Sequence, residues 1–458
     1  MPRKLWGSRF PKKTSAITDK FTSSISFDKR LAKYDCIGSI AHARMLGRQR
    51  IIPAKDASLI VKGLKAMLKD ILAGKFKFDS RAEDVHSNIQ EALLKKIGKA
   101  AYKLHTARSR NDQVVLDVKM YLKDEGKNLA ELITELQKSI LKFAKSNIKV
   151  IIPGYTHLQK AQCVLLAHHL LAYIEGLERD KQRLIDAGKR IDEMPLGACA
   201  LSGTGLNIDR EYVRKELGFS KVTQNSIDSV SDRDFILELL AGLSILSVHL
   251  SRIAEDLILW STKEFNFINI DYAFCTGSSI MPHKKNPDVL ELIRGSVGKI
   301  QGDFSSVLIM MKGLPFSYNR DLQLDKPALF DAIDTIEGIL EIFILLFENI
   351  IIEKEAIKAR LKDESLFSVD IVEYLIKKGV SYREAHDIVG RLVRGSLDKG
   401  KPISGLTNSE LQKYAKELGP QVKNILNAKT SVNLKRSYGS TNPRLVSRQI
   451  KNWSRRLK

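Results

Sequence analysis

Apolar residues recur at every third or fourth position over four long stretches of the chain. The stretches lie near residues 129–143, 166–177, 235–257 and 333–350. This spacing places the apolar side chains on one face of an α-helix. Four such helices predict a helical bundle. Several of them are apolar on more than one side, so we expect burial against other subunits, although the periodicity also fits a monomeric bundle.

The pattern divides the chain into three parts and predicts an all-α fold. We expect a smaller helical domain over residues 1–112 and a central domain of long helices over 113–361. Shorter helices with Gly and Pro breaks predict a third domain over 362–458. Strands and helices do not alternate, which argues against a parallel α/β sheet.

Composition narrows the class of protein. The chain has 458 residues, 43% hydrophobic and 28% charged, as in a soluble globular enzyme of more than one domain. Its N-terminus has no apolar core of signal-peptide length, and the longest apolar stretch, residues 239–250, is too short to span a bilayer. The four cysteines are scattered, without metal-ligand spacing. We therefore expect a cytoplasmic protein with no metal and no membrane contact.

A formal net charge of +22 raises nucleic-acid binding as a competing interpretation. The 75 basic residues are, however, spread along the chain among 53 acidic ones, and no zinc-finger or aromatic RNA-binding pattern accompanies them. A solvated basic surface is the better interpretation. We expect no nucleic-acid partner, and the positive field favours small anionic substrates.

Two polar segments before helices carry candidate binding groups. In residues 103–114, Ser109, Arg110 and Asn111 could hold a carboxylate through charge-assisted hydrogen bonds. A helix cap with surface charge explains them equally well. In residues 153–162, His157 follows Thr156 after an expected Pro-Gly turn and could bind substrate and move protons. A lone histidine is more often structural.

The strongest chemical signal is the polar segment 276–295. Ser278 lies in a glycine-led loop, followed by Lys284 and Lys285. Asn286 is expected to cap the next helix, whose positive N-terminal end beside two lysines would attract an anion. Glu291, early in that helix, could orient a histidine. The alternative is a flexible surface loop. A weaker segment, residues 313–326, adds Tyr318, Arg320, Gln323 and Lys326.

These residues resemble a known family. The stretch from Gly277 to Pro287 is similar to the signature loop of the fumarase/aspartase superfamily. The companion motifs resemble the argininosuccinate lyases within it, specifically from Trp6 to about Lys326 and more loosely beyond. They are WGSRF near the start, SRND at 109–112, GYTHLQ at 154–159, SDRDF at 231–235, and YNRDLQ at 318–323 with Lys326.

The resemblance implies a fold, an assembly and a reaction. The fold would be the three-domain fumarase/aspartase type, with the long helices packed into the core of a homotetramer. Each active site would be assembled from three subunits. The reaction would be reversible anti-elimination of fumarate from argininosuccinate, releasing arginine through a carbanion-like intermediate, without metal or organic cofactor.

The resemblance also assigns roles to individual residues. Ser278 matches the catalytic base, and His157, with Glu291 as its carboxylate partner, matches the histidine of proton transfer. Lys284 and Asn286 match groups that stabilise a substrate carboxylate. The other substrate-binding positions implied are Ser24, His86, Ser109, Arg110, Asn111, Thr156, Tyr318, Gln323 and Lys326.

Two departures and two alternatives accompany the resemblance. His283 stands where the family usually has glutamine, and Ser8 where a second glycine is usual. Neither replaces a proton-transfer residue, but His283 could alter loop closure or pH dependence. Another fumarate-releasing lyase, or a non-catalytic crystallin-like protein that kept the fold, is the alternative interpretation.

Overall fold

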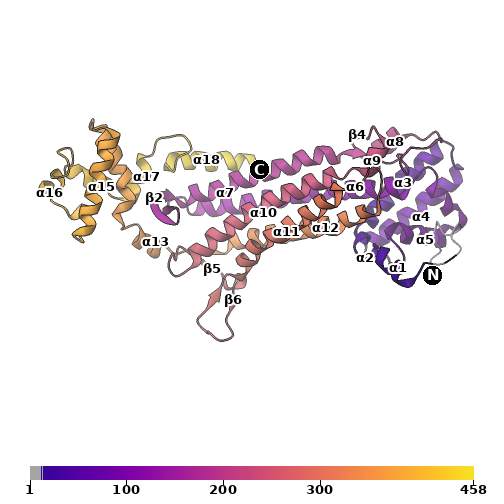
Figure 1. Cartoon of the computed structure of the whole chain (residues 1–458), viewed down its shortest axis with the longest axis horizontal. Helices are drawn as coiled ribbons and strands as arrows, with labels where there is room; N and C mark the ends of the chain where they lie inside the picture. The colour runs from indigo at the N-terminus through magenta and orange to yellow at the C-terminus, as the bar shows by residue number, and fades with distance from the viewer. Residues whose placement is uncertain (1–11, 13) are drawn as a thin grey trace. The chain divides into compact units, whose positions relative to one another are not determined.

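Figure 1 shows the computed structural model of the chain, which describes residues 12 and 14–458. Ser8 and the WGSRF motif lie outside the described residues. The chain is predominantly helical, which confirms the all-α prediction. The longest helices, which contain the four predicted apolar stretches, are α6 (Arg110–Ser146), α7 (Leu166–Ile191), α10 (Asp234–Ser261), α11 (Asp288–Lys312) and α12 (Asp325–Glu348).

The chain forms two compact units, each made of three separate segments. The first contains residues 1–130, 181–245 and 298–336, and the second contains 131–180, 246–297 and 337–458. The divisions fall inside the five long helices, so each unit contains part of every one of them. The three sequence-based domain ranges stay a prediction.

In the first unit, α3 and α4 lie side by side (Figure 1). Gly38 on α3 permits close contact with α6, because a Cβ there would lie 2.8 Å from Leu116 Cδ2. The other elements wholly inside this unit are short. The unit contains α1 (Ala16–Thr22), α2 (Ile25–Asp28), η2 (Lys29–Leu31), α3 (Ala32–Arg48), α4 (Ala54–Leu72), α5 (Val85–Ile97), η3 (Gly98–His105), β3 (Glu193–Met194), α8 (Arg210–Glu216), β4 (Lys221–Val222), α9 (Ser226–Ser231) and η5 (Arg320–Leu324).

The second unit holds the shorter C-terminal helices that the Gly and Pro breaks predicted. Ile371, Leu375, Leu392 and Leu411 are fully buried in an apolar core between these helices. The unit contains β1 (Ile151–Thr156), β2 (Gln159–Leu165), β5 (Ile268–Ile270), η4 (Tyr272–Phe274), β6 (Thr276–Gly277), β7 (Lys285–Asn286), β8 (Ile350–Ile352), α13 (Lys354–Arg360), η6 (Glu364–Phe367), α14 (Ser368–Lys377), α15 (Tyr382–Asp398), η7 (Ile403–Gly405), α16 (Asn408–Gln412), η8 (Pro420–Ile425), α17 (Ala428–Leu434) and α18 (Pro443–Arg456).

The strands are short and form two-stranded sheets. β1 pairs with β2, β5 with β8, and β6 with β7, all antiparallel, whereas β3 and β4 are parallel. In the longest hairpin, β1–β2, Ile151 faces Leu165, and a bulge interrupts the ladder between Pro153 and Tyr155. These sheets connect helices and do not form a core of their own.

One helix in the described part of the chain, α10, is long and apolar enough to span a membrane by length and composition. More than half of its most apolar stretch is buried inside the structure. Leu243, Leu246 and Leu250 of this helix are fully buried. Such burial is typical of a core helix in a large helical fold.

Candidate active site

The fourteen site residues expected from sequence fall into two groups, one in each compact unit. All five residues with an expected part in proton transfer or charge stabilisation lie in the second unit. The first-unit group is Ser24, His86, Ser109, Arg110, Asn111, Tyr318, Gln323 and Lys326, and the second-unit group is Thr156, His157, Ser278, Lys284, Asn286 and Glu291.

His157 lies at the tip of the β1–β2 hairpin. Thr156 pairs with Gln159, so His157 and Leu158 form a two-residue turn, with φ of +53° and +56°. A turn with two positive φ values suits the right-handed twist of a hairpin, but side chains other than Gly, Asn and Asp are strained there. The expected Pro-Gly turn is wrong, because Pro153 lies inside β1. The turn leaves the His157 side chain exposed.

Ser278 begins the loop between β6 and β7. Its Oγ accepts hydrogen bonds from the backbone N–H groups of Ile280, at 3.3 Å, and Met281, at 3.0 Å. The serine is half-buried, while Ile280 is 82% exposed at the end of the loop. In Figure 1 the loop projects away from the neighbouring helices. The fold therefore places a serine oxygen and an apolar tip on the same exposed loop.

The two lysines of this loop have different surroundings. Lys285 Nζ donates to Asn269 Oδ1 at 2.9 Å and to the carbonyl of Ile270, and it lies 4.0 Å from the centre of the Tyr272 ring. Lys284 is exposed, and its amine contacts no acidic or polar side chain of the described residues. Lys285 therefore anchors the base of the loop, and Lys284 is left as its available cation.

The expected N-cap at Asn286 is wrong. Asn286 belongs to β7 and pairs with Thr276, and α11 begins at Asp288. The carbonyl of Pro287 accepts the first helical hydrogen bonds, from Leu290 at 2.9 Å and Glu291 at 3.2 Å. Asn286 is thus held on a strand beside the loop, which leaves its side-chain amide half-buried next to the helix start.

Glu291, in the first turn of α11, is exposed. No hydrogen bond or ion pair joins it to His157 within residues 14–458 of one chain. The pairing of these two side chains, implied by the family resemblance, stays a prediction.

Two side chains hold the guanidinium of Arg110, which lies at the start of α6. Its Nε lies 2.8 Å from Asp84 Oδ2, and its Nη2 donates to Ser87 Oγ at 2.8 Å. Asp84 also caps α5 by accepting from the Ser87 N–H. Burial raises the pKa of Asp84, but Arg110, His86 and the hydrogen bonds from Ser87 together outweigh burial and lower the pKa of that carboxyl. The buried Nη1 of Arg110 has no hydrogen-bond partner among the described residues, so it can donate to a ligand oxygen.

Hydrogen bonds that involve backbone groups hold Asn111 and Asp112, which follow Arg110, in place. Asn111 Nδ2 donates to the carbonyl of Ala200 at 2.9 Å, and its N–H donates to Ser109 Oγ at 3.2 Å. Asp112 is fully buried and accepts from the N–H groups of Ser109, Gly197 and Cys199. The structural role of Asp112 was missed in the sequence, although it is the last residue of the SRND motif.

Lys326 is buried in a charge network at the start of α12. Its Nζ lies 2.6 Å from Asp325 Oδ1, and Arg233 Nε lies 2.5 Å from Asp325 Oδ2. All three residues are at most 3% exposed. Burial lowers the pKa of Lys326, and Asp325 opposes that change. Sequence analysis missed Arg233 and Asp325, which lie in or beside the quoted SDRDF and YNRDLQ motifs.

Three further binding candidates surround the N-terminal segment of the first unit. Ser24 is buried and donates to Asp28 Oδ2 at 2.5 Å. Gln323 Nε2 donates to the carbonyl of Thr22 at 3.3 Å. Tyr318 is half-buried, and burial raises the pKa of its phenol. These contacts place Ser24 and Gln323 against the same short stretch of chain.

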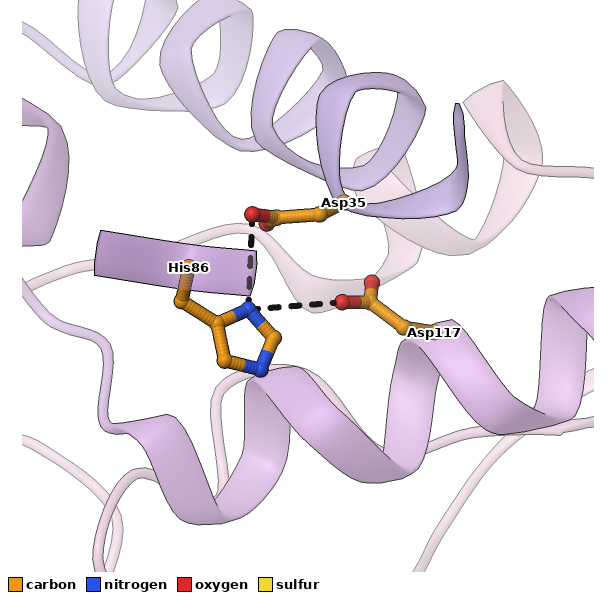
Figure 2. A group of neighbouring side chains, drawn as sticks. All are labelled: Asp35, His86 and Asp117. Atoms are coloured by element: carbon orange, nitrogen blue, oxygen red, sulfur yellow. Dashed lines mark ion pairs between the residues drawn. The ribbon is translucent and has the colours of Figure 1, made fainter. Parts of the chain in front are cut away.

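His86 lies in the first turn of α5, where it is 5% exposed. Figure 2 shows the carboxyl groups of Asp35 on α3 and Asp117 on α6 both facing one nitrogen of its ring. One ligand atom from each of these three residues lies within 4.8 Å of the others. Sequence analysis found no metal-ligand spacing, because these residues come from three separate helices that only the fold brings together.

Known proteins with similar sequences agree on one family. A family model described as "Lyase" matches residues 8–302, and one described as "Argininosuccinate lyase C-terminal" matches residues 366–433. The chain is 48% identical to an argininosuccinate lyase from Pelotomaculum thermopropionicum, over 99% of both chains. It is 47% identical to another from Syntrophotalea carbinolica, over 98% of both chains.

Solved structures of related lyases share the fold. The structure of EDDS lyase in complex with formate is 26% identical, with a TM-score of 0.81, and the match covers 96% of this chain and 88% of that one. A class II fumarase from Schistosoma mansoni is 16% identical with a TM-score of 0.75, covering 90% and 92%. The fumarase likeness supports the fold alone. From the sequence and family matches, this chain belongs to the argininosuccinate lyase family.

Proposed function

We propose that the protein catalyses the reversible elimination of fumarate from argininosuccinate and thereby releases arginine. The observation that carries the proposal is the Ser278 loop, in a chain 48% identical to an argininosuccinate lyase over nearly its whole length. Arginine biosynthesis in the cytoplasm is the proposed setting. Argininosuccinate carries three carboxylates, which suits the cationic residues proposed to bind it, Arg110, Lys284 and Lys326.

The proton to be removed lies on a carbon next to a carboxylate. Its removal breaks a C–H bond and adds negative charge to a group that is already anionic. The electron pair then forms the double bond of fumarate as the bond from carbon to the guanidino nitrogen breaks. Catalysis therefore requires a base for the proton, cations for the carboxylate charge and an acid for the departing nitrogen.

Ser278 is the proposed base. A serine hydroxyl is a weak base unless its alkoxide is stabilised. The N–H groups of Ile280 and Met281 already point at Ser278 Oγ, and donation to an oxygen favours its charged form. Closure of the exposed loop over substrate would exclude water and strengthen this stabilisation.

Lys284 and Asn286 are the proposed partners of the carboxylate on which charge develops. Lys284 is the available cation of the loop, and Asn286 lies on β7 next to the start of α11. A helix N-terminus also favours nearby negative charge. His157, supported by Glu291, is proposed to give its proton to the departing guanidino nitrogen. Thr156, next to it in the hairpin, is proposed to bind substrate.

The remaining binding residues are proposed to hold the ends of the substrate. The buried Nη1 of Arg110 has no partner in the part of the chain that the structure describes, and Ser109 and Asn111 are its neighbours in sequence. We propose a homotetramer with sites shared between three subunits. The absence of a His157–Glu291 contact within residues 14–458 of one chain supports a pairing between subunits, as do exposed apolar side chains on α11, such as Leu292 and Ile309.

The test follows fumarate by ultraviolet absorbance. Purified protein is mixed with argininosuccinate and, separately, with adenylosuccinate, malate and aspartate. Ser278→Ala is expected to lose activity by about 10²–10⁴-fold, the usual contribution of a general base. Ser279→Ala, a neighbouring exposed serine in the same loop, is the matched control and is expected to stay close to wild type.

The outcomes separate the competing functions. Fumarate from argininosuccinate alone, lost only in Ser278→Ala, supports the proposal. Fumarate from a different substrate would keep the fold's reaction class and overturn the specificity. No fumarate from any substrate, with a folded oligomer, would support the non-catalytic crystallin-like alternative.

A further inference from the structure

His86 is surrounded by acids on the side of its first ring nitrogen. Nδ1 lies 3.3 Å from Asp35 Oδ2 and 3.7 Å from Asp117 Oδ2, and both acids are at most 1% exposed. Figure 2 shows the second ring nitrogen pointing away from both carboxyl groups. Both acids therefore face the same ring nitrogen, and neither faces the other.

The two acids are not equivalent. Asp35 Oδ1 accepts from Gln113 Nε2 and, at 3.3 Å, from Ser39 Oγ. Ser39 in turn accepts from Arg108 Nη1 at 2.8 Å. Among the described residues, Asp35 Oδ2 and both carboxyl oxygens of Asp117 have no hydrogen-bond partner, so donors reach one oxygen of Asp35 and neither oxygen of Asp117. Donors favour an ionised carboxylate, and their absence in a buried site favours the protonated acid.

The pKa values of Asp35 and Asp117 are shifted in opposite directions, in agreement with these hydrogen bonds. Burial raises the pKa of Asp35, but His86, Arg108 and Gln113 outweigh it, so that the pKa lies below the usual range. Burial and the charge of Asp35 hold the pKa of Asp117 well above its usual range. Two buried carboxyl groups this close ionise one at a time. Asp35 therefore carries the charge and Asp117 the proton.

We propose that Asp35 is the positioning residue for His86, and that Asp117 assists it as a neutral acid. Asp35 accepts the Nδ1 proton and thereby fixes the ring orientation. In the protonated ring, the second N–H is then directed at a carboxylate of the substrate. The inference rests on the proposed function, because it takes His86 as a substrate-binding residue.

Other charged groups also act on the ring. A divalent cation between the three ligand atoms would be a different explanation of the cluster. The guanidinium of Arg108 is close enough to act on both carboxyl groups, which disfavours a further cation there. The remaining titratable groups that interact with His86 are Asp28, Asp84 and His105.

The experiment compares three acid-to-amide variants. Asp35→Asn is expected to lower kcat/KM by about 10–100-fold, as loss of an orienting partner does in histidine sites. Asp117→Asn is expected to stay within about threefold, because an amide resembles the protonated acid. Asp124→Asn is the matched control. It removes another contact between α6 and α3, to Lys33 and Tyr34, without touching His86.

A second readout does not depend on turnover. Hydrogen–deuterium exchange at the imidazole C2–H of His86, followed by mass spectrometry at one pH, reports the surroundings of the ring in the intact oligomer. Asp35→Asn is expected to change the exchange rate, because the ring loses the anion beside Nδ1, and Asp117→Asn is expected to leave the rate close to that of the wild type. If the wild type fails to turn over argininosuccinate, this readout still tests the pairing, and only the proposed function falls.

Two results would overturn the inference. The first is an Asp117→Asn variant as strongly changed as Asp35→Asn in kcat/KM and in the exchange rate of His86. The second is a rise in thermal midpoint when Mn²⁺ or Zn²⁺ is added after dialysis against chelator, lost in both amide variants, which would establish a cation site. An unchanged thermal midpoint with either metal, together with the asymmetric variants, supports the proposal.

Discussion

The two groups of candidate site residues differ in how firmly the protein holds them. In the first unit, Arg110 and Lys326 are tied by ion pairs to Asp84 and Asp325, and most neighbouring groups are buried or half-buried. In the second unit, the group lies on a hairpin turn, a loop and a helix start, and several of its side chains are exposed. Binding groups in the first unit are thus held in fixed positions, and the groups proposed for proton transfer lie on a turn, a loop and a helix start that face solvent.

This difference has a physical reason. A cation buried without a partner is strongly unfavourable, so binding residues in the interior require fixed acids around them. A base and an acid that must meet substrate and exclude water need access first and enclosure afterwards. The comparison predicts that variants of the first group change stability, and variants of the second change turnover.

The largest expected effect is on the buried network of the first unit. Asp325→Asn leaves Arg233 and Lys326 buried without their shared anion. Loss of one partner from such a network is expected to lower the free energy of unfolding by about 3–5 kcal/mol. Urea unfolding at constant protein concentration measures it. Asp321→Asn, an exposed acid in η5, is the control, and equal losses in both variants would contradict the network's role.

Substitutions at the Ser278 loop of the second unit are expected to change turnover rather than stability. Lys284→Ala is expected to lower kcat by about 10²–10³-fold, as loss of one charge-stabilising group does, with little change in thermal midpoint. Lys285→Ala is the matched variant. It is expected to lower kcat less and to make the loop more sensitive to proteolysis, because it removes the contacts to Asn269 and Tyr272. The reverse order would make Lys285 the catalytic cation.

A smaller effect is expected on the pH dependence of stability in the first unit. Burial raises the pKa of Asp112 to about 6 from 3.8, although three N–H groups favour its carboxylate. The folded protein therefore binds this proton more tightly than the unfolded chain. Protonated Asp112 therefore stabilises the folded protein by about 3 kcal/mol. This contribution is complete below pH 4 and is lost as the pH rises to about 6.

Asp112→Asn removes this titration. Urea unfolding of variant and wild type between pH 4 and 7 is the measurement. The free energy of unfolding of the variant, relative to that of the wild type, is expected to rise by about 3 kcal/mol between pH 4 and 6. Above pH 6 this difference is expected to stay constant. A difference between the two proteins that does not change with pH would show that Asp112 is ionised throughout.

Much of the fold could be predicted from the sequence. The apolar stripes near 129–143 and 235–257 lie in α6 and α10, and the helix periodicity survives because it depends only on neighbours three or four residues apart. The positions at which helices and strands begin and end were less certain. Asn286 belongs to a strand and Pro153 to another, because pairing with a distant segment outweighs local turn and capping preferences.

The candidate site was predictable in its residue types but not in its surroundings. Ser278, His157 and Arg110 were found by motif, and the partners Asp84 and Asp325 were not singled out. An acidic residue in a motif looks the same in the sequence whether its side chain faces solvent or a buried cation. Only packing distinguishes the two, because desolvation decides whether a charge needs a fixed partner.

The sequence by itself determined the helical class, the family and the residues that carry the chemistry, because periodicity and ordered motifs are properties of the chain. Tertiary structure alone decided which charges are held and which are free. It separated Lys284 from Lys285, one residue apart, and brought Asp35, His86 and Asp117 together from three helices. Burial and long-range contact set these outcomes, and neither is encoded in local spacing.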